Sequence, residues 1–409
     1  MLNAAGEREL AYVVIIDGIE PIEGYDRVEH AIVGGWRVIV QKGQFKVGDP
    51  AIYFEIDSRV PSDRECFAFL EKRHYKIKTL KMCKTLSQGL LMHAEDFGWN
   101  NVMYNEKPCI VDDEDISHFS DDESRFLTQK LGVTYADDED NSRKAPSVDK
   151  YKKMASRHQK LFKKPFIRWL MRHNWGRKLL FFLFGKKKDK KNSWPSWVSK
   201  TDEERVQNMP WILNSNDTWI ATEKIDGTST TFTMKRGKFG RLHLYVCSRN
   251  VCFDTVDKPC YYDTNVYWEM AKKYHIYKVL SDMMTRYPHE EWITIQGETY
   301  GNGVQKRDYS IEDHDFAAFN LIFSSIGRWD TMAMKTLLEE EYYIPCVPVV
   351  ENHIVFTDKF ATVEDMLLWA EGESKLDGLP REGIVFRTID GQKSFKAVSN
   401  SFLLKYHGG

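Results

Sequence analysis

The segment Thr222-Glu223-Lys224-Ile225-Asp226-Gly227 places a lysine, an aspartate and a glycine within four residues. Residues two apart in an extended segment point to the same side, so Lys224 and Asp226 are expected to face one ligand. Gly227 then permits a sharp turn or close approach by that ligand. A lysine amine attacks only when it is unprotonated, and a nearby cation or bound metal lowers its pKa. Lys224 is thus a candidate nucleophile, and Asp226 is a candidate to hold a metal or a ribose; the pattern is short, however, and by itself also fits a solvated lysine on a β-turn.

Five further short segments carry polar or aromatic residues next to β-like runs. In chain order they are Cys247–Asn250 with Arg249, Ile295–Gly301 with Glu298, Phe316–Asn320 with Phe319, Arg381–Arg387 with Glu382, and Ser394–Val398 with Lys396. Each has a plain structural interpretation by itself: a surface arginine, a core aromatic or an edge charge. Their occurrence together and in this order behind Lys224 makes coincidence unlikely as an explanation.

These elements resemble the covalent nucleotidyltransferase superfamily, which comprises ATP-dependent DNA ligases, RNA ligases and mRNA capping enzymes. The resemblance implies that Lys224 attacks the α-phosphate of a nucleoside triphosphate and releases pyrophosphate. It also implies that Phe319 stacks on the purine and that a Mg²⁺ or Mn²⁺ ion lies near the α-phosphate. The nucleotide-binding residues that it implies are Lys224, Asp226, Arg249, Glu298, Phe319, Glu382 and Lys396, and the metal ligands are Asp226, Glu298 and Glu382.

Two phosphate contacts are harder to place. The superfamily commonly ends its catalytic domain with Lys-x-Lys, whereas this chain has Lys396-Ala397-Val398, which leaves Lys405 or Lys393 to supply the second cation. Upstream, Trp197–Asn208 is similar to a segment in which an arginine, here Arg205, binds the terminal phosphates of ATP. The same segment has a hydroxyl residue followed by acids, which is typical of a helix N-cap, and both interpretations can hold together.

The elements that must position these residues are predicted from about residue 196 onward. Strands that follow strands, with helices inserted between them, indicate antiparallel sheets and an α+β fold. The predicted strands are Thr218–Lys224, Thr228–Met234, Leu242–Cys247, Trp292–Gln296, Phe316–Phe323, Gly383–Arg387 and Ser394–Val398. The predicted helices are Asp202–Asn208, Asn265–Met284, Trp329–Glu340 and Thr362–Glu373. Residues 196–409 are therefore expected to form the adenylyltransferase domain.

Residues 1–110 are predicted to form a small β-barrel such as an OB-fold, because short strands alternate with glycine turns. The expected strands include Ala11–Ile16, Trp36–Val40 and Ala51–Ile56, and periodicity alone does not separate OB from SH3-like barrels. The stretches Glu20–Ser58 and Lys84–Leu90 resemble the nick-sealing RNA ligases that carry an OB domain before the catalytic domain. DNA ligases and capping enzymes place theirs after the final lysine motif, and only four residues follow Lys405.

Residues 111–195 are predicted to be a charged linker with a helical insertion at Tyr151–Phe184. Between Arg143 and Lys191 there are 18 lysines and arginines against two acids, so this stretch carries +16 in a chain of net charge −2. A basic block suits a polyanion partner, because neutralising phosphates releases counterions. We expect segment 143–191 to contact RNA phosphates; a solvated surface is the alternative.

Other features narrow the class of protein. Seven scattered cysteines without a CxxC pair argue against a structural zinc site and a disulfide framework. No apolar run has the length of a membrane span and no signal peptide is recognisable, so an intracellular, cytoplasmic protein is expected.

The function that the resemblance implies is ATP-dependent RNA ligation. It would seal 3′-OH and 5′-phosphate ends at nicks in duplex RNA or an RNA–DNA hybrid, through a lysyl-AMP and an adenylated 5′ end. The alternatives are a GTP-using capping-type guanylyltransferase, a DNA-only ligase and a nucleic-acid-binding protein with an inactive catalytic domain.

Overall fold

The computed structural model describes residues 8–99, 126–136, 194–201, 203–253 and 265–407, the backbone of 102–104 and 107–110, and the single residues 167, 170 and 180. Two compact units are present, one made of Met1–Thr134 with Asn192–Gly409 and the other of Tyr135–Lys191. The helices predicted for Tyr151–Phe184, and almost all of basic segment 143–191, lie outside the described residues. No helix in the described part of the chain is long and apolar enough to cross a bilayer.

The N-terminal domain is built from short antiparallel strands around one core. One sheet contains β1 (Ala11–Ile15), β5 (Pro50–Phe54) and β10 (Leu90–Met92), and a second contains β2 (Gly18–Ile22), β3 (Tyr25–Val33) and β4 (Trp36–Gln41). Smaller pairs are made by β6 (Ser58–Arg59) with β7 (Lys76–Ile77), β8 (Leu80–Met82) with β9 (Thr85–Ser87), and β11 (Val102–Tyr104) with β12 (Lys107–Ile110). Alternate residues point inward, so Val38 and Val40 of β4 meet Ala51 and Tyr53 of β5.

The N-terminal fold also includes residues that the sequence analysis placed in the linker beyond residue 110. Phe126 forms a β-bridge with Tyr12, and α1 (Thr128–Leu131) begins beside β1. The hydroxyl of Thr128 accepts the backbone N–H of Leu10, and β13 (Thr134–Tyr135) joins β6. The two 3-10 helices of this domain are η1 (Glu65–Arg73) and η2 (Glu95–Phe97).

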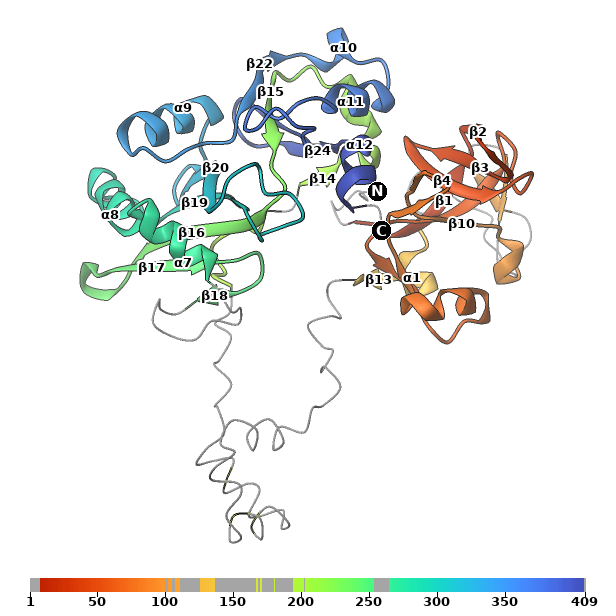
Figure 1. Ribbon diagram of the computed structural model, residues 1–409, viewed down its shortest axis with the longest axis horizontal. Helices are drawn as coiled ribbons and strands as arrows, with labels where there is room; N and C mark the ends of the chain where they lie inside the picture. The colour runs from red at the N-terminus through yellow and green to blue at the C-terminus, as the bar shows by residue number, and fades with distance from the viewer. Residues whose placement is uncertain are drawn as a thin grey trace. The chain divides into compact units, whose positions relative to one another are not determined.

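The C-terminal domain contains two sheets with helices packed on them (Figure 1). The six-stranded sheet has the order β18-β17-β16-β19-β20-β21: Cys252–Phe253, Leu242–Cys247, Thr228–Arg236, Trp292–Gly301, His314–Phe323 and Gly327–Arg328. Its apolar face packs against α7 (Val266–Lys273), α8 (Ile276–Arg286) and α9 (Thr331–Thr336). Phe232 and Met234 of β16 point into that core, whereas Thr231 and Thr233 lie on the opposite, polar face.

The five-stranded sheet has the order β14-β24-β23-β15-β22: Glu204–Arg205, Ser394–Val398, Gly383–Thr388, Trp219–Lys224 and Val349–Ile354. Ile384 and Phe386 of β23 enter a core with residues of α10 (Phe356–Lys359) and α11 (Val363–Ala370). Val385 and Arg387 therefore lie on the other face. The chain then forms α12 (Asn400–Phe402) and the π-helical turn η7 (Leu403–His407).

The α+β expectation is confirmed, and β17 and β24 have the predicted bounds, but three of the four predicted helices differ in the structure. The predicted helix Asp202–Asn208 is replaced by β14 and a 3-10 turn, η3 (Val206–Asn208), followed by η4 (Pro210–Asn214). Asn265–Met284 is two helices, α7 and α8, because His275 between them has a left-handed φ of 48°. The predicted helix Trp329–Glu340 is α9 continued by a π-helical turn, η6 (Leu337–Glu341); the remaining short element is η5 (Lys238–Gly240).

Candidate active site

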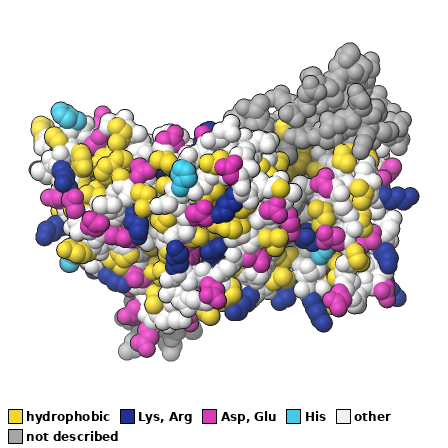
Figure 2. Space-filling view, turned by 90° about the horizontal axis from the view of Figure 1, so that it is seen from above, with side chains coloured by type: hydrophobic (Ala, Val, Ile, Leu, Met, Phe, Trp, Pro, Cys, Tyr) yellow, Lys and Arg dark blue, Asp and Glu magenta, His cyan; other side chains and the backbone are white. Residues whose placement is uncertain are grey.

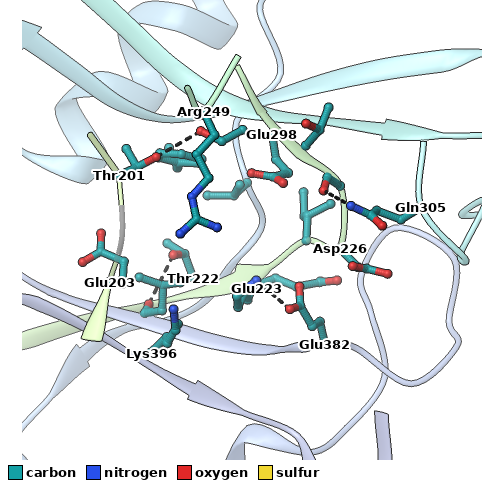
Figure 3. Close-up of a pocket in the computed structure, with 18 of the residues that line it drawn as sticks. Thr201, Glu203, Thr222, Glu223, Asp226, Arg249, Glu298, Gln305, Glu382 and Lys396 are labelled. Carbon is teal, nitrogen blue, oxygen red and sulfur yellow. Dashed lines mark hydrogen bonds and ion pairs between the residues drawn. The ribbon is translucent and has the colours of Figure 1, made fainter. Parts of the chain in front are cut away.

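The two sheets of the C-terminal domain line a pocket of about 350 Å³ (Figure 3). It contains seven of the nine residues that the sequence analysis assigned to nucleotide binding: Lys224, Asp226, Arg249, Glu298, Phe319, Glu382 and Lys396. They come from β15, β19, β20, β24 and the turns at strand ends. The fold therefore brings together residues that are up to 172 positions apart, from 224 to 396, in the sequence.

Lys224 is the last residue of β15, and it pairs with Gly383 of β23. Its Nζ donates to Oε1 of Glu382 at 2.6 Å, while Oε2 of Glu382 is buried without a hydrogen-bond partner among the described residues. Burial favours the neutral amine, but the carboxylates of Glu382, Glu298 and Asp226 outweigh it and raise the pKa of Lys224. The lowering of the pKa that was expected from a nearby cation or bound metal is therefore opposed by the three carboxylates.

The turn after Lys224 requires its glycine. A Cβ on Gly227 would lie 2.3 Å from the carbonyl oxygen of Thr299 and 2.8 Å from Cγ of Glu298. Gln305 Nε2 donates to the carbonyl of Gly227 at 3.0 Å, and the N–H of Asp226 donates to the hydroxyl of Tyr309 at 2.6 Å. These contacts hold the turn so that Asp226 faces the pocket (Figure 3).

Glu298 lies on β19 opposite Ser229 of β16. Burial raises its pKa, the ammonium of Lys224 lowers it, and the carboxylates of Glu382 and Asp226 raise it further, to about 8. The glycine before it was expected to leave room for a sugar. The structure gives another reason, because a Cβ on Gly297 would lie 2.3 Å from the ring of Phe316.

The three predicted metal ligands share the pocket but do not form a ready-made metal cage. Within the described ranges, no group of three or more His, Cys, Asp or Glu side chains is placed to hold a metal ion. Asp226, Glu298 and Glu382 nevertheless all act electrostatically on Lys224. The unpaired Oε2 of Glu382 also fits a cation, because Mg²⁺ commonly binds one or two carboxylates and completes its shell with phosphates and water.

Two cations extend toward the same space from different walls of the pocket. Arg249 lies in the turn between β17 and β18, and Lys396 lies on β24, where it pairs with Val385 (Figure 3). A hydrogen bond of 3.0 Å between the hydroxyls of Thr201 and Ser229 ties the segment before β14 to the start of β16. Cations placed this way can neutralise phosphate oxygens.

Sequence reasoning missed Arg387, which lines the pocket from β23. Its side chain is only 3% exposed, and its guanidinium lies 3.1 Å from Glu203 and 3.3 Å from the hydroxyl of Thr222. It also lies 5.5 Å from the ring centroid of Phe319. The sequence did contain an indication of this role, because Arg387 is two residues after Val385 and therefore lies on the same face of the strand.

Arg205 and Lys405, in contrast, do not line the pocket. The guanidinium of Arg205 lies over the indole of Trp36, 5.8 Å from the ring centroid. Lys405 is exposed on the last helical turn, where Leu403 and Leu404 pack on Leu86 of the N-terminal domain. The other candidate, Lys393, forms an exposed ion pair of 2.6 Å with Asp217. Neither lysine outside β24 is therefore placed to be the second phosphate contact.

Comparison with known families follows the same division of the chain. Residues 10–94 match an OB-fold domain family, and residues 217–407 match the RNA ligase family. The C-terminal domain belongs to the RNA ligase family. The OB alternative is thus confirmed over the SH3-like one, and the OB domain precedes the RNA ligase domain as expected.

Solved structures of an RNA ligase from Naegleria gruberi share the fold of almost the whole chain. The complex with pyrophosphate is 24% identical, covers 98% of this chain and 99% of that one, and has a TM-score of 0.64. A lysine-to-alanine variant with ATP and Mn and a lysine-to-methionine variant with AMP and Mn are each 24% identical, with TM-scores of 0.65, covering 98% of this chain and all of theirs. No curated protein matches the chain.

Proposed function

We propose that this protein is an ATP-dependent RNA ligase that joins 3′-OH and 5′-phosphate ends, with Lys224 as the nucleophile. The observation that carries the proposal is the pocket in which Lys224 lies among three carboxylates, two facing cations and an aromatic ring. The match of residues 217–407 to the RNA ligase family supports the proposal. So does the likeness of the fold to the Naegleria ligase, which was solved with ATP and Mn and with AMP and Mn.

In the first step, the amine of Lys224 attacks the α-phosphorus of ATP, and a P–N bond forms while the bond to pyrophosphate breaks. Such displacements depend on alignment and on neutralising charge at the phosphoryl oxygens. Arg249 and Lys396 are placed to neutralise charge on the phosphoryl oxygens, and Phe319 is placed to stack on the adenine. Arg387 takes the place proposed for the missing second lysine, since it lies on the strand next to Lys396. Arg205 and Lys405 do not line this pocket, so the phosphate contacts proposed here are Arg249, Lys396 and Arg387.

Lys224 must lose its proton before it attacks, and the raised pKa of Lys224 works against this. Mg²⁺ or Mn²⁺ bound at the pocket would polarise the α-phosphate and offset the three carboxylates that hold the proton. Glu382 would hold it through its unpaired Oε2, with Glu298 and Asp226 as inner- or outer-shell partners.

The later steps transfer AMP from Lys224 to a 5′-phosphate and then expel AMP when a neighbouring 3′-OH attacks that end. Both are displacements at phosphorus that reuse the same cations. Nicked duplex RNA or an RNA–DNA hybrid is the substrate we propose, because of the N-terminal position of the OB domain. Basic segment 143–191, outside the described residues, would add phosphate contacts.

The deciding experiment offers the purified protein ATP or GTP labelled on the α-phosphate, with Mg²⁺ or Mn²⁺. Label from ATP that withstands denaturation, and that pyrophosphate removes, supports the lysyl-AMP. Label from GTP alone would assign the protein to capping-type guanylyltransferases. A folded sample that takes label from neither would favour an inactive catalytic domain. Gel analysis of nicked RNA, hybrid and DNA duplexes then identifies the substrate.

A further inference from the structure

The hairpin of β16 and β17 carries positive charges but no carboxylate. From Thr228 to Phe253 the chain contains five lysines and arginines and no aspartate or glutamate. This is unusual for the molecule, since side chains of both signs are interspersed on the face drawn in Figure 2. The hairpin begins at the pocket, where Ser229 and Arg249 line the wall. Nine residues of β16 then extend about 27 Å away from it, at roughly 3.3 Å per residue.

The tip of this hairpin presents an aromatic ring between two cations. Phe239 is 100% exposed and lies between exposed Lys238 and Arg241. Its backbone has φ 60° and ψ 27°, a left-handed conformation that bulky side chains rarely adopt. Nothing in the hydrophobic cores of the described residues uses this ring. A fully solvated phenylalanine gains nothing for folding, so the ring and its two cations form a surface available to a partner.

A row of cations and aromatic rings joins this tip to the pocket. Lys235 lies over the indole of Trp197, with Nζ 3.9 Å from the ring centroid, and Trp197 contacts Tyr245 edge-on at 5.4 Å. His243 pairs with Lys235 and is exposed. Gln296 on the same polar face of the sheet donates to the carbonyl of Ser199, which fixes the segment carrying Trp197 against this face.

We propose that this row, which we call the hairpin strip, binds the sugar–phosphate backbone and an unstacked base of the polynucleotide substrate. The strip consists of Trp197, Lys235, Lys238, Phe239, Arg241 and His243. Cations supply the sequence-independent attraction to phosphates, and an exposed ring supplies a stacking surface for any base. The length of β16 corresponds to about eight phosphates of one strand at 3.4 Å spacing. The proposal rests on the proposed function, because it assumes that the pocket acts on a polynucleotide.

The test uses the full chain and a nicked RNA duplex of about 20 base pairs, longer than the hairpin, that ends in a few unpaired nucleotides, because the bases inside a duplex are already stacked on one another. The variants are Lys238→Gln with Arg241→Gln, and Phe239→Asn, which suits the left-handed backbone and should not disturb folding. The matched controls remove equal groups on helices α7 and α8, which cover the opposite face of the sheet: Lys272→Gln with Lys278→Gln, and the exposed Tyr277→Ser. Fluorescence anisotropy measures binding over a range of salt concentrations, and labelling by ATP is measured in parallel.

We expect the two-charge variant to weaken binding and to reduce the slope of log affinity against log salt by about 1 to 2, as two lost phosphate contacts should. Phe239→Asn should weaken binding about fivefold or more. The controls should bind like the wild type, and every variant should take up label from ATP normally. Hairpin and control variants with equal affinities and slopes would overturn the proposal. Wild-type protein that binds RNA through the strip but takes no label would instead overturn the proposed ligase function alone.

Discussion

Lys224 Nζ lies 2.6 Å from Glu382 Oε1, so the proposed nucleophile is held by the carboxylate that immediately precedes the neighbouring strand β23. The contact follows from the pairing of Lys224 with Gly383, the residue after Glu382. A Cβ on Gly383 would lie 2.2 Å from the carbonyl oxygen of Ala397, and its φ is 156°. The glycine therefore permits the close approach of β24 that places Lys396 in the same pocket.

Two interpretations of this ion pair predict opposite effects of Glu382→Gln. Loss of the carboxylate removes one of the charges that raise the pKa of Lys224. If Glu382 only held the proton on the lysine, the variant would take up AMP faster at neutral pH. We expect instead at least about a hundredfold slower labelling, because the proposed metal ligand is lost together with charge stabilisation in the transition state. Labelling by ATP at several Mn²⁺ concentrations measures this, with Lys224→Arg as the unreactive control.

The stability of the RNA ligase domain should depend on pH through Glu290. Burial favours the neutral carboxyl, but hydrogen bonds from Ser324 and Ser325 outweigh it and lower the pKa of Glu290. A lowered folded-state pKa gives stability that is present above the unfolded value of about 4.3 and is lost as pH falls through the folded value. Glu290→Gln should reduce the free energy of unfolding by about 1–3 kcal/mol at pH 7, and by less in acid.

Urea unfolding at neutral and acidic pH checks this, with Glu291→Gln, an exposed neighbour, as the control. A loss that is the same at both pH values would mean that the carboxylate charge is not responsible.

The strands of the C-terminal domain could be predicted because the alternation of core-facing and pocket-facing residues is visible within each short segment. Ile384 and Phe386 alternate with Val385 and Arg387, and this pattern alone fixes which residues share the pocket face. The structure of Asp202–Asn208 could not be predicted from the residues of that segment alone. Its hydroxyl-and-acid pattern is that of an N-cap, but Glu204–Arg205 pair in parallel with Phe395–Lys396, about 190 residues later. The tertiary pairing of these two strands outweighed the local preference for a helix, and Pro210 begins a separate 3-10 turn two residues after Asn208.

The second phosphate contact is hard to predict for a similar reason. Lys405 is close to Lys396 in sequence, but a separation of nine positions allows a chain reversal. In the structure, the side chains of Leu403 and Leu404 pack on Leu86 instead of the pocket. Arg387 is closer in space because neighbouring strands lie about 4.8 Å apart. The sequence contains the right residue types, but sequence distance is a poor guide to which of them meet.

Phe319 has two possible roles that a single substitution can separate. Its ring lines the pocket and lies 5.5 Å from Arg387, yet it also packs beside a small apolar cluster around Ile225. Phe319→Leu keeps an apolar side chain but removes the flat ring. If the ring stacks on adenine, the KM for ATP should rise at least about fivefold while the fold remains, since base stacking contributes about 1–3 kcal/mol. Phe319→Tyr should behave like the wild type. Normal ATP kinetics from Phe319→Leu would make Phe319 a packing residue.

The last prediction separates Arg387 and Lys396 from Lys405. Removing Arg387 alone would take the ion-pair partner from Glu203, which would keep only its hydrogen bond from Ser394, so the informative variant is Glu203→Gln with Arg387→Gln. A lost charge-assisted hydrogen bond contributes about 1.5–3 kcal/mol, so this variant and Lys396→Gln should each slow labelling by ATP roughly tenfold or more. Lys405→Gln should have no effect, because its side chain is outside the pocket. Thermal unfolding identifies variants that fail to fold. Slow labelling by Lys405→Gln with normal labelling by the Arg387 variant would return the second phosphate contact to Lys405.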